Sequence, residues 1–315
     1  MMNEYAMKDI RALGEFVIER SREAMLKAVR EWPGGALQGE MTIDGYDEPI
    51  TLKARLTIAR DGIDIDFTGT SPVSPRGINV PMSYTDAYTS FGVRCIIGAQ
   101  VPNNAGSLSV VRVTAPEGCI LNAPFPRAVA ARSNVGQMLP DVVFNCLRQV
   151  RPDKVPAEGT SALWNIRLSS TPGDTTQPFN VVGCNTGGTG ARPAQDGLSV
   201  TSFPSGIRNV SLEIMETISP LVFWRKEYRP DSGGAGQQRG GLGQVIEVEH
   251  GGKAAMVLSA TFDRMAYPAR GANGGQPGAV GRVRLKSGAG LKGMGRQVVP
   301  ADDRLIVETP GGGGV

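Results

Sequence analysis

The first clear hydrophobic period lies near the start of the chain, over residues 7–32. Its apolar side chains recur three or four positions apart, and charged side chains occupy many of the positions between them. This spacing is typical of an amphipathic α-helix, and Pro33, followed by two glycines, ends it. Such a stripe can bind a partner or pack on the core of its own domain, and the pattern favours the second.

Alternating patterns follow and predict strands. Residues 51–67 alternate on both sides of Asp61 and Gly62, which predicts a hairpin. Residues 85–99 and 133–151 have helical character. Further strand-like runs cover residues 108–114, 160–168, 179–184 and 221–228.

Beyond residue 243 the patterned segments are of the strand type. They cover residues 244–249, 255–262, 280–285 and 304–308, and glycine-rich turns separate them. We therefore predict an α+β fold, in which a mixed αβ region precedes a β-rich part that resembles a sandwich or a barrel. As domains we expect residues 1–230, which include the N-terminal helix, and residues 231–315.

Glycine and proline are unusually frequent, with 42 and 22 residues in a chain of 315. The densest stretch, residues 229–243, reads RPDSGGAGQQRGGLG and contains six glycines. Glycine inside a helix or strand costs backbone entropy and packs no side chain, so this stretch is neither. A flexible linker is usually rich in serine and poor in charge. The charged residues Asp231 and Arg239 therefore favour an ordered loop.

The remaining composition limits the classes of function. A net charge of +3 gives no indication of nucleic-acid binding, and no segment approaches the roughly 18 apolar residues of a membrane span. The four cysteines are far apart and predict buried thiols, as in a cytoplasmic protein. The single histidine, His250, precedes two glycines, so we expect a surface turn there and not a catalytic group.

Glycine loops also raise the question of nucleotide binding. Neither GxGxxG nor GxxxxGK[ST] occurs in the strand–turn–helix context that it requires. Residues 187–190 follow a predicted strand, but Pro193 interrupts the long helix that would have to come next. An anion site built from backbone N–H groups together with Arg192 or Arg239 stays open.

Several sequence blocks occur in the order and spacing of one protein family. They are DFTGTSP at 66–72, GIN at 77–79, VPNNAGSL at 101–108, APEGCILNAPFPRAVAAR at 115–132, GGTGARPAQDG at 187–197, EIMETISP at 213–220, RPDSGGAGQQRGGLG at 229–243 and ARGANGG at 269–275. Any one block is a weak signal. Together they resemble the C-terminal portion of the hydantoinase B/5-oxoprolinase family.

The resemblance implies an enzyme that opens a cyclic amide, such as 5-oxoproline, a hydantoin or a lactam. It implies ATP as cofactor, bound by a hydantoinase A-type subunit or domain that phosphorylates the carbonyl oxygen of the ring, and hence an oligomer. Phosphorylation suits the chemistry, because an unactivated amide is a poor electrophile. Acetone and acetophenone carboxylase subunits are related, so a carboxylase branch stays open, as does a non-catalytic scaffold that holds a partner.

The chain also departs from the family pattern. Family members carry an N-terminal stretch rich in aspartate and histidine that is associated with metal binding, and a chain with one histidine does not contain it. A metal ion is expected for the family, but no metal ligand can be assigned in this chain. We therefore expect a fragment, a split-gene product or a degenerate copy that is inactive alone.

Seven residues in the matching blocks have side chains that suit the implied reaction. Asparagine can hold a carbonyl or amide, arginine a phosphorylated or carboxylate group, and aspartate can act as a general base. The substrate-binding candidates are Asn79, Asn103, Arg132, Arg192 and Arg239, and the catalytic candidates are Asp196 and Asp231. Both aspartates can instead be turn residues that accept loop N–H groups, and the arginines can instead hold loops together.

Overall fold

The computed structural model describes residues 9–172 and 178–315. Its helices are α1 (Arg11–Arg30), α2 (Met82–Ile96), α3 (Ala105–Leu108), α4 (Ser133–Gly136), α5 (Leu139–Leu147) and α6 (Leu212–Ile218). Its strands are β1 (Gly35–Ile43), β2 (Ile50–Ala59), β3 (Gly62–Asp66), β4 (Val111–Thr114), β5 (Trp164–Ser170), β6 (Asn180–Asn185), β7 (Leu221–Tyr228), β8 (Gln244–His250), β9 (Met256–Thr261), β10 (Arg282–Leu285), β11 (Met294–Val299) and β12 (Leu305–Glu308).

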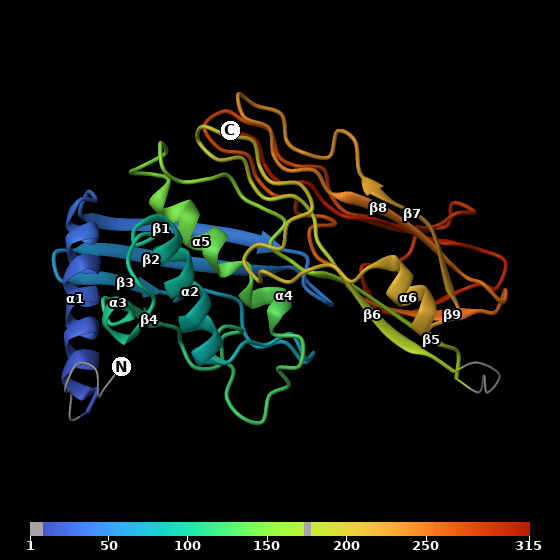
Figure 1. Cartoon of the computed structure of the whole chain (residues 1–315), viewed down its shortest axis with the longest axis horizontal. Helices are drawn as coiled ribbons and strands as arrows, with labels where there is room; N and C mark the ends of the chain where they lie inside the picture. The colour runs from blue at the N-terminus through green and yellow to red at the C-terminus, as the bar shows by residue number, and fades with distance from the viewer. Residues whose placement is uncertain (1–8, 173–177) are drawn as a thin grey trace.

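The N-terminal part is a mixed sheet with helices packed on it (Figure 1). The strands lie in the order β1-β2-β3-β4, with β3 and β4 parallel and the other pairs antiparallel. Along β2, Leu52 and Leu56 are fully buried while Lys53 and Arg55 are exposed, because successive side chains of a strand point to opposite faces. Helix α5 packs on β1 and β2, and α2 packs on α5.

The C-terminal part consists of two antiparallel four-stranded sheets, ordered β10-β12-β8-β7 and β11-β9-β5-β6. Within the described ranges neither sheet closes into a barrel. A mixed region followed by a β-rich part confirms the predicted fold class. Strands from both sides of residue 230 build these sheets, since β5, β6 and β7 precede it; the domain boundary at that residue stays a prediction.

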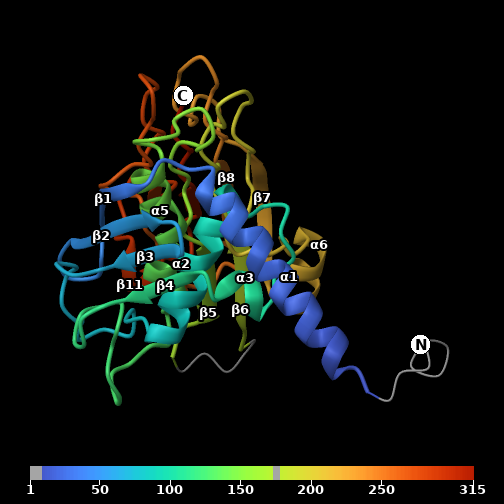
Figure 2. The ribbon, with the colours of Figure 1, turned by 90° about the vertical axis from the view of Figure 1, so that its left-hand side faces the viewer.

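Helix α1 is present as predicted, but only its C-terminal half packs on the core. Met25 and Val29 are fully buried, whereas Ile10 and Phe16 are each 57% exposed. Twenty helical residues span about 30 Å, and the N-terminal turns extend beyond the sheet (Figure 2). The expectation that the stripe packs on the core of its own domain therefore holds for the C-terminal half of the helix and not for its exposed N-terminal half. Residues 7 and 8 of the predicted helix lie outside the described residues.

Four glycine-rich segments run side by side and hydrogen-bond through their backbones. We call residues 187–200, 231–243, 269–279 and 309–315 the glycine bundle. The N–H groups of Gly188, Gly234 and Gly311 donate to the carbonyl oxygens of Pro310, Gly312 and Ala279. In Figure 1 these yellow, orange and red loops converge near the C-terminus. The stretch at 229–243 is thus an ordered loop, as predicted.

Close backbone contact explains the glycine content of the bundle. A Cβ atom on Gly311 would lie 1.7 Å from the Ser232 carbonyl oxygen, and one on Gly312 would lie 1.9 Å from the Thr189 carbonyl oxygen. Both distances are far below van der Waals contact, and both obstacles are backbone atoms that other segments hold in place. Residues 310–314 are all buried, so this stretch is an interior element of the fold.

We predict that Gly312→Ala destabilises the chain by about 3 kcal/mol or more, because the added methyl overpacks a site that cannot relax. Urea denaturation followed by circular dichroism measures the change. Gly290→Ala is the matched control, since a Cβ there meets nothing within 4 Å. Equal stability of the two variants would show that the bundle is not tightly packed.

Candidate functional site

A buried ionic cluster lies where the N-terminal helices meet the glycine bundle. Arg264, 1% exposed, follows β9 and holds a left-handed backbone conformation with φ of 64°. Its Nη1 lies 3.3 Å from Glu158 Oε2, and its Nη2 lies 3.6 Å from Asp141 Oδ2. One buried guanidinium therefore bridges two buried carboxylates from α5 and from the segment before β5.

Glu158 is the fixed anion of this cluster. Its two carboxylate oxygens accept hydrogen bonds from Asn145 Nδ2 at 2.8 Å and from the backbone N and the Nε of Arg270 at 2.9 and 2.7 Å. Burial opposes its ionisation, but the charges of Arg264 and Arg270 outweigh burial and lower the pKa of Glu158. Its backbone also joins the bundle, because its carbonyl oxygen accepts from the N–H of Gly313.

An apolar pocket of about 450 Å³ opens next to the cluster. The end of α2, the helix α5, residues 154–159 and the loop after β6 line it. Phe144 and Phe203 form one wall, stacked with ring centroids 6.1 Å apart. Asp141, Arg192 and the exposed Lys154 are among the residues that line it. The lining therefore combines apolar side chains with three residues that carry ionisable groups.

Cys95 also lines the apolar pocket. Burial raises the pKa of its thiol to about 11, so this cysteine stays neutral at physiological pH and is not a thiolate nucleophile. All four cysteines are free, with Cys119 and Cys146 buried and the other two half-buried. The four cysteines are therefore free thiols, as predicted, but the predicted burial holds only for Cys119 and Cys146.

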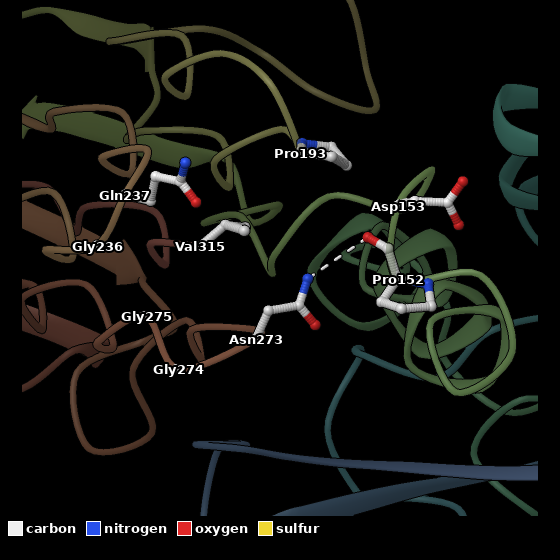
Figure 3. A pocket seen from close by; sticks show the side chains of 9 residues that line it. All are labelled: Pro152, Asp153, Pro193, Gly236, Gln237, Asn273, Gly274, Gly275 and Val315. Carbon is white, nitrogen blue, oxygen red and sulfur yellow. Dashed lines mark hydrogen bonds between the residues drawn. The ribbon is translucent and has the colours of Figure 1, made fainter.

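A second hollow of about 470 Å³ lies on the other side of Pro193, which lines both. Figure 3 shows Asn273 reaching toward Pro152 across it, where Asn273 Nδ2 donates to the Pro152 carbonyl oxygen at 3.4 Å. Its one charged lining side chain, Asp153, is paired with Arg151 at 2.8 Å. Among the described residues that line this hollow there is no lysine or arginine, whereas both occur in the lining of the apolar pocket.

Three of the residues predicted from sequence come together beside the apolar pocket. Arg192 Nη2 donates to the Asp196 carbonyl oxygen at 2.8 Å, and Asp196 Oδ1 accepts from the backbone N of Arg239 at 2.8 Å. The side chains of Asp196 and Arg239 approach to 3.7 Å. The side chain of Asp196 thus accepts a hydrogen bond from a loop N–H group. This is the contact expected if Asp196 is a turn residue and not a general base. Among the three, Arg192 lines the pocket.

The other four candidates lie elsewhere. Asn79 is 1% exposed, and its side chain accepts from the N–H of Ser74 and donates to three backbone carbonyl groups, so it joins two loops. Arg132 is exposed and stacks over the ring of Tyr84 at 5.6 Å. Two further candidates are exposed: Asn103, next to the capping residue of α3, and Asp231, whose φ of 56° is typical of a turn.

The expectation that His250 lies in a surface turn was wrong. It is 5% exposed and ends β8, and its Nδ1 accepts from the backbone N of Gly252 at 3.1 Å. The ring lies against Phe179, with centroids 5.8 Å apart. The two glycines do form the expected turn, but the imidazole folds back beneath it.

Within residues 9–172 and 178–315, no three His, Cys, Asp or Glu side chains form a group that could hold a metal ion. The donor set for a metal is therefore not assembled by the described residues, and we assign no residue to one. None of the helices in these ranges is both long enough and apolar enough to cross a membrane.

The sheets, the glycine bundle and the pocket define a mixed α/β protein with open antiparallel sheets. A family model described as hydantoinase B/oxoprolinase matches residues 1–315, so the chain belongs to that family. The chain is similar to 5-oxoprolinase 1 of Arabidopsis thaliana, with 30% identity over 334 residues that cover 100% of this chain and 25% of that protein.

Two solved structures share the fold. The ATP-dependent caprolactamase of Pseudomonas jessenii has a TM-score of 0.82 at 23% identity, covering 99% of this chain and 57% of that one. An acetone carboxylase in its nucleotide-free form has a TM-score of 0.77 at 17% identity, covering 93% and 47%. The chain spans half or less of the first curated relatives that it matches, with 50% of one and 25% of another.

We predict that Asp263 contributes stability that is lost as pH rises from about 4 to about 7, because its carboxyl group is buried beside the cluster. Burial, and then the charge of Asp44, raises the pKa of Asp263 to about 6 from an ordinary value of 3.8. A raised folded-state pKa gives a contribution that is present below the unfolded value and lost as pH rises through the folded value. The shift in the pKa of Asp263 corresponds to roughly 3 kcal/mol in the free energy of unfolding.

Asp263→Asn keeps an acceptor at Oδ1 for the N–H groups of Arg264 and Asp44, and it cannot ionise. Urea denaturation at several pH values should show a shallower loss of stability for this variant than for the parent chain. Asp302→Asn, at an exposed aspartate, is the control. An identical pH profile for parent and Asp263→Asn would mean that Asp263 ionises normally.

Proposed function

We propose that this chain supplies the ring-binding part of an enzyme that opens a cyclic amide after ATP-dependent activation by a hydantoinase A-type subunit or domain. Family membership and relatives named 5-oxoprolinase and caprolactamase support the reaction class. The observation that carries the proposal is the apolar pocket with Arg192 and Lys154 in its lining. Its size suits a small ring, and its cations suit an anionic group on that ring.

Different parts of the pocket would bind the apolar ring and its negatively charged group. The methylene groups of a ring would pack against the wall that Phe144 and Phe203 form. Phosphorylation of the carbonyl oxygen gives every such ring a negative group, whether or not the ring carries a carboxylate of its own. Arg192 and Lys154 would hold that group, since charge-assisted hydrogen bonds to phosphate or carboxylate are among the strongest available to a protein.

Neither ATP nor a metal ion is assigned a binding site in this chain, for different reasons. ATP would be bound by the A-type partner, because no glycine loop of this sequence has the pattern of a nucleotide site. When bound there, ATP supplies the phosphoryl group that activates the ring. For a metal ion the described residues do not fit, and no step is assigned to one.

A second candidate function is a non-catalytic interaction subunit. The exposed apolar stripe on the first half of α1, which includes Leu13, Phe16 and Val17, favours it, since such a stripe is typical of a surface that binds another protein. A subunit of the carboxylase branch is a further alternative, supported by the fold shared with acetone carboxylase.

We predict that Arg192→Ala and Lys154→Ala each raise the KM for the ring roughly 10- to 100-fold, because each removes a charge-assisted contact of about 1.5–3 kcal/mol. The assay uses this chain together with its A-type partner, ATP and 5-oxoproline, a hydantoin or caprolactam. We expect no turnover from the 315-residue chain alone. Arg167→Ala, at an exposed arginine on β5, is the charge-matched control.

Turnover with an unchanged KM in both pocket variants would place the substrate elsewhere. Stable binding of the A-type partner without ATP-dependent ring opening of any tested substrate would favour the interaction subunit. Clear ring opening by the isolated chain would contradict the requirement for a partner.

A further inference from the structure

The apolar pocket contains a buried carboxyl group that no predicted site residue supplies. Asp141 comes from α5, lines the pocket and is 1% exposed. Its Oδ2 accepts hydrogen bonds from Ser161 Oγ at 2.6 Å and from the backbone N of Gly159 at 3.1 Å. Its Oδ1 has no hydrogen-bond partner among the described residues. One oxygen is therefore fixed by the fold, and the other is available to a bound molecule.

Asp141 shares its nearest cation with a second buried carboxylate. Arg264 Nη2 lies 3.6 Å from Oδ2, but the same guanidinium also pairs with Glu158 at 3.3 Å. Glu158 has a second cation in Arg270, whereas Arg148 donates to the Asn145 side chain and to the Pro156 carbonyl oxygen and acts on Asp141 only through its charge. Lys154 and Arg192 also line the pocket.

This arrangement lets Asp141 hold a proton close to neutral pH. Burial raises the pKa of Asp141 to about 6, the charge of Arg264 opposes the shift, and the charge of Glu158 adds to it. The hydrogen bond from Ser161 stabilises the ionised form and also opposes the shift. A buried carboxyl group with such a pKa is suited to general acid catalysis.

We propose that Asp141 donates the proton that the ring nitrogen needs when the cyclic amide opens, and that Ser161 and Arg264 position its carboxyl group. This role rests on the proposed function and adds to it a residue that touches the reacting atoms. The proton sits on Oδ1, because Oδ2 already accepts two hydrogen bonds. Neither the family blocks nor the candidates chosen from sequence included Asp141.

The step balances with water as the nucleophile and the phosphorylated ring as the electrophile. Water adds to the activated carbonyl carbon and forms a C–O bond, and one of its protons goes to the ring nitrogen as the C=N bond becomes single. The C–N bond of this adduct then breaks, and its electron pair goes to nitrogen together with the proton from Oδ1. The remaining carbon group becomes an acyl phosphate, and the hydroxyl proton that the adduct loses restores the carboxyl group of Asp141. A second water then cleaves the acyl phosphate to a carboxylate and inorganic phosphate. Without a proton donor at nitrogen, the adduct would expel phosphate and re-form the amide.

The test compares Asp141→Asn with the parent in the assembled enzyme, that is, this chain together with its A-type partner and ATP. Asp141→Asn should lower the single-turnover rate of ring opening at least about 100-fold, as expected for loss of a general acid. ATP-dependent phosphorylation of the ring should continue, because the A-type partner performs it. A parent-like rate of ring opening in a folded Asp141→Asn enzyme would overturn the assignment.

The pH dependence of ring opening in Ser161→Ala is a second test. It would not change if Asp141 had a purely structural role. Loss of its hydrogen bond raises the pKa of Asp141 further, so the fall of ring opening with rising pH should shift to higher pH. Ser287→Ala is the matched control, because Ser287 Oγ donates to Asp303 Oδ2 at a distant turn. An unshifted profile in Ser161→Ala would overturn the assignment even if Asp141→Asn does not fold.

The same experiments separate failure of this step from failure of the proposed function. If the parent enzyme forms no phosphorylated ring and opens none of the tested rings, the proposed function fails and Asp141 loses its role with it. If the parent opens the ring normally and both variants keep its rate and pH profile, the proposed function stands and only the role of Asp141 is wrong.

Discussion

The close approach of glycine backbones in the bundle is the constraint on which the rest of the structure depends. The N–H groups of Gly188 and Ala191 donate to the carbonyl oxygens of Pro310 and Gly313, more than a hundred residues along the chain. The segments lie so close that a Cβ atom on Gly312 would be 1.9 Å from the Thr189 carbonyl oxygen. Backbone N–H and C=O groups must be paired when buried, and here they pair with one another outside any regular sheet. The bundle therefore acts as a core made of main chain, and it connects the helical part to the two antiparallel sheets.

The candidate site depends on this bundle in a direct way. Glu158 joins the bundle through its backbone and holds Arg264 and Arg270 through its side chain. Arg264 in turn reaches Asp141 on α5, so the ionic cluster spans the junction between the two parts of the chain. The pocket opens between the bundle and the helices, with Arg192 contributed by a bundle loop. The packing of the glycine bundle therefore determines both the position of the buried ionic cluster and the shape of the apolar pocket.

The sequence predicted those features that arise from local patterns. The hairpin at 51–67 became β2 and β3, because alternation and an Asp-Gly turn are encoded within a few residues. Strand β1 was missed, since two glycines and a glutamine weaken its alternation. Of the site, Arg192 was found through its glycine-rich block, whereas Asp141 and Arg264 were not. Asp141 is a single charge inside the apolar run of α5, which was the one available signal, and Arg264 follows Asp263 in a short loop after β9. Only tertiary contact brings the two together.

Hydrogen–deuterium exchange of the 315-residue chain tests most directly whether the glycine bundle is an ordered core. Peptides that cover residues 238–243 and 309–315 should exchange as slowly as those that cover β8, because their backbone N–H groups donate hydrogen bonds within the bundle or to neighbouring segments. Exchange at the rate of an unstructured chain in both segments would contradict the account, since neither the ionic cluster nor the pocket could then be held as described.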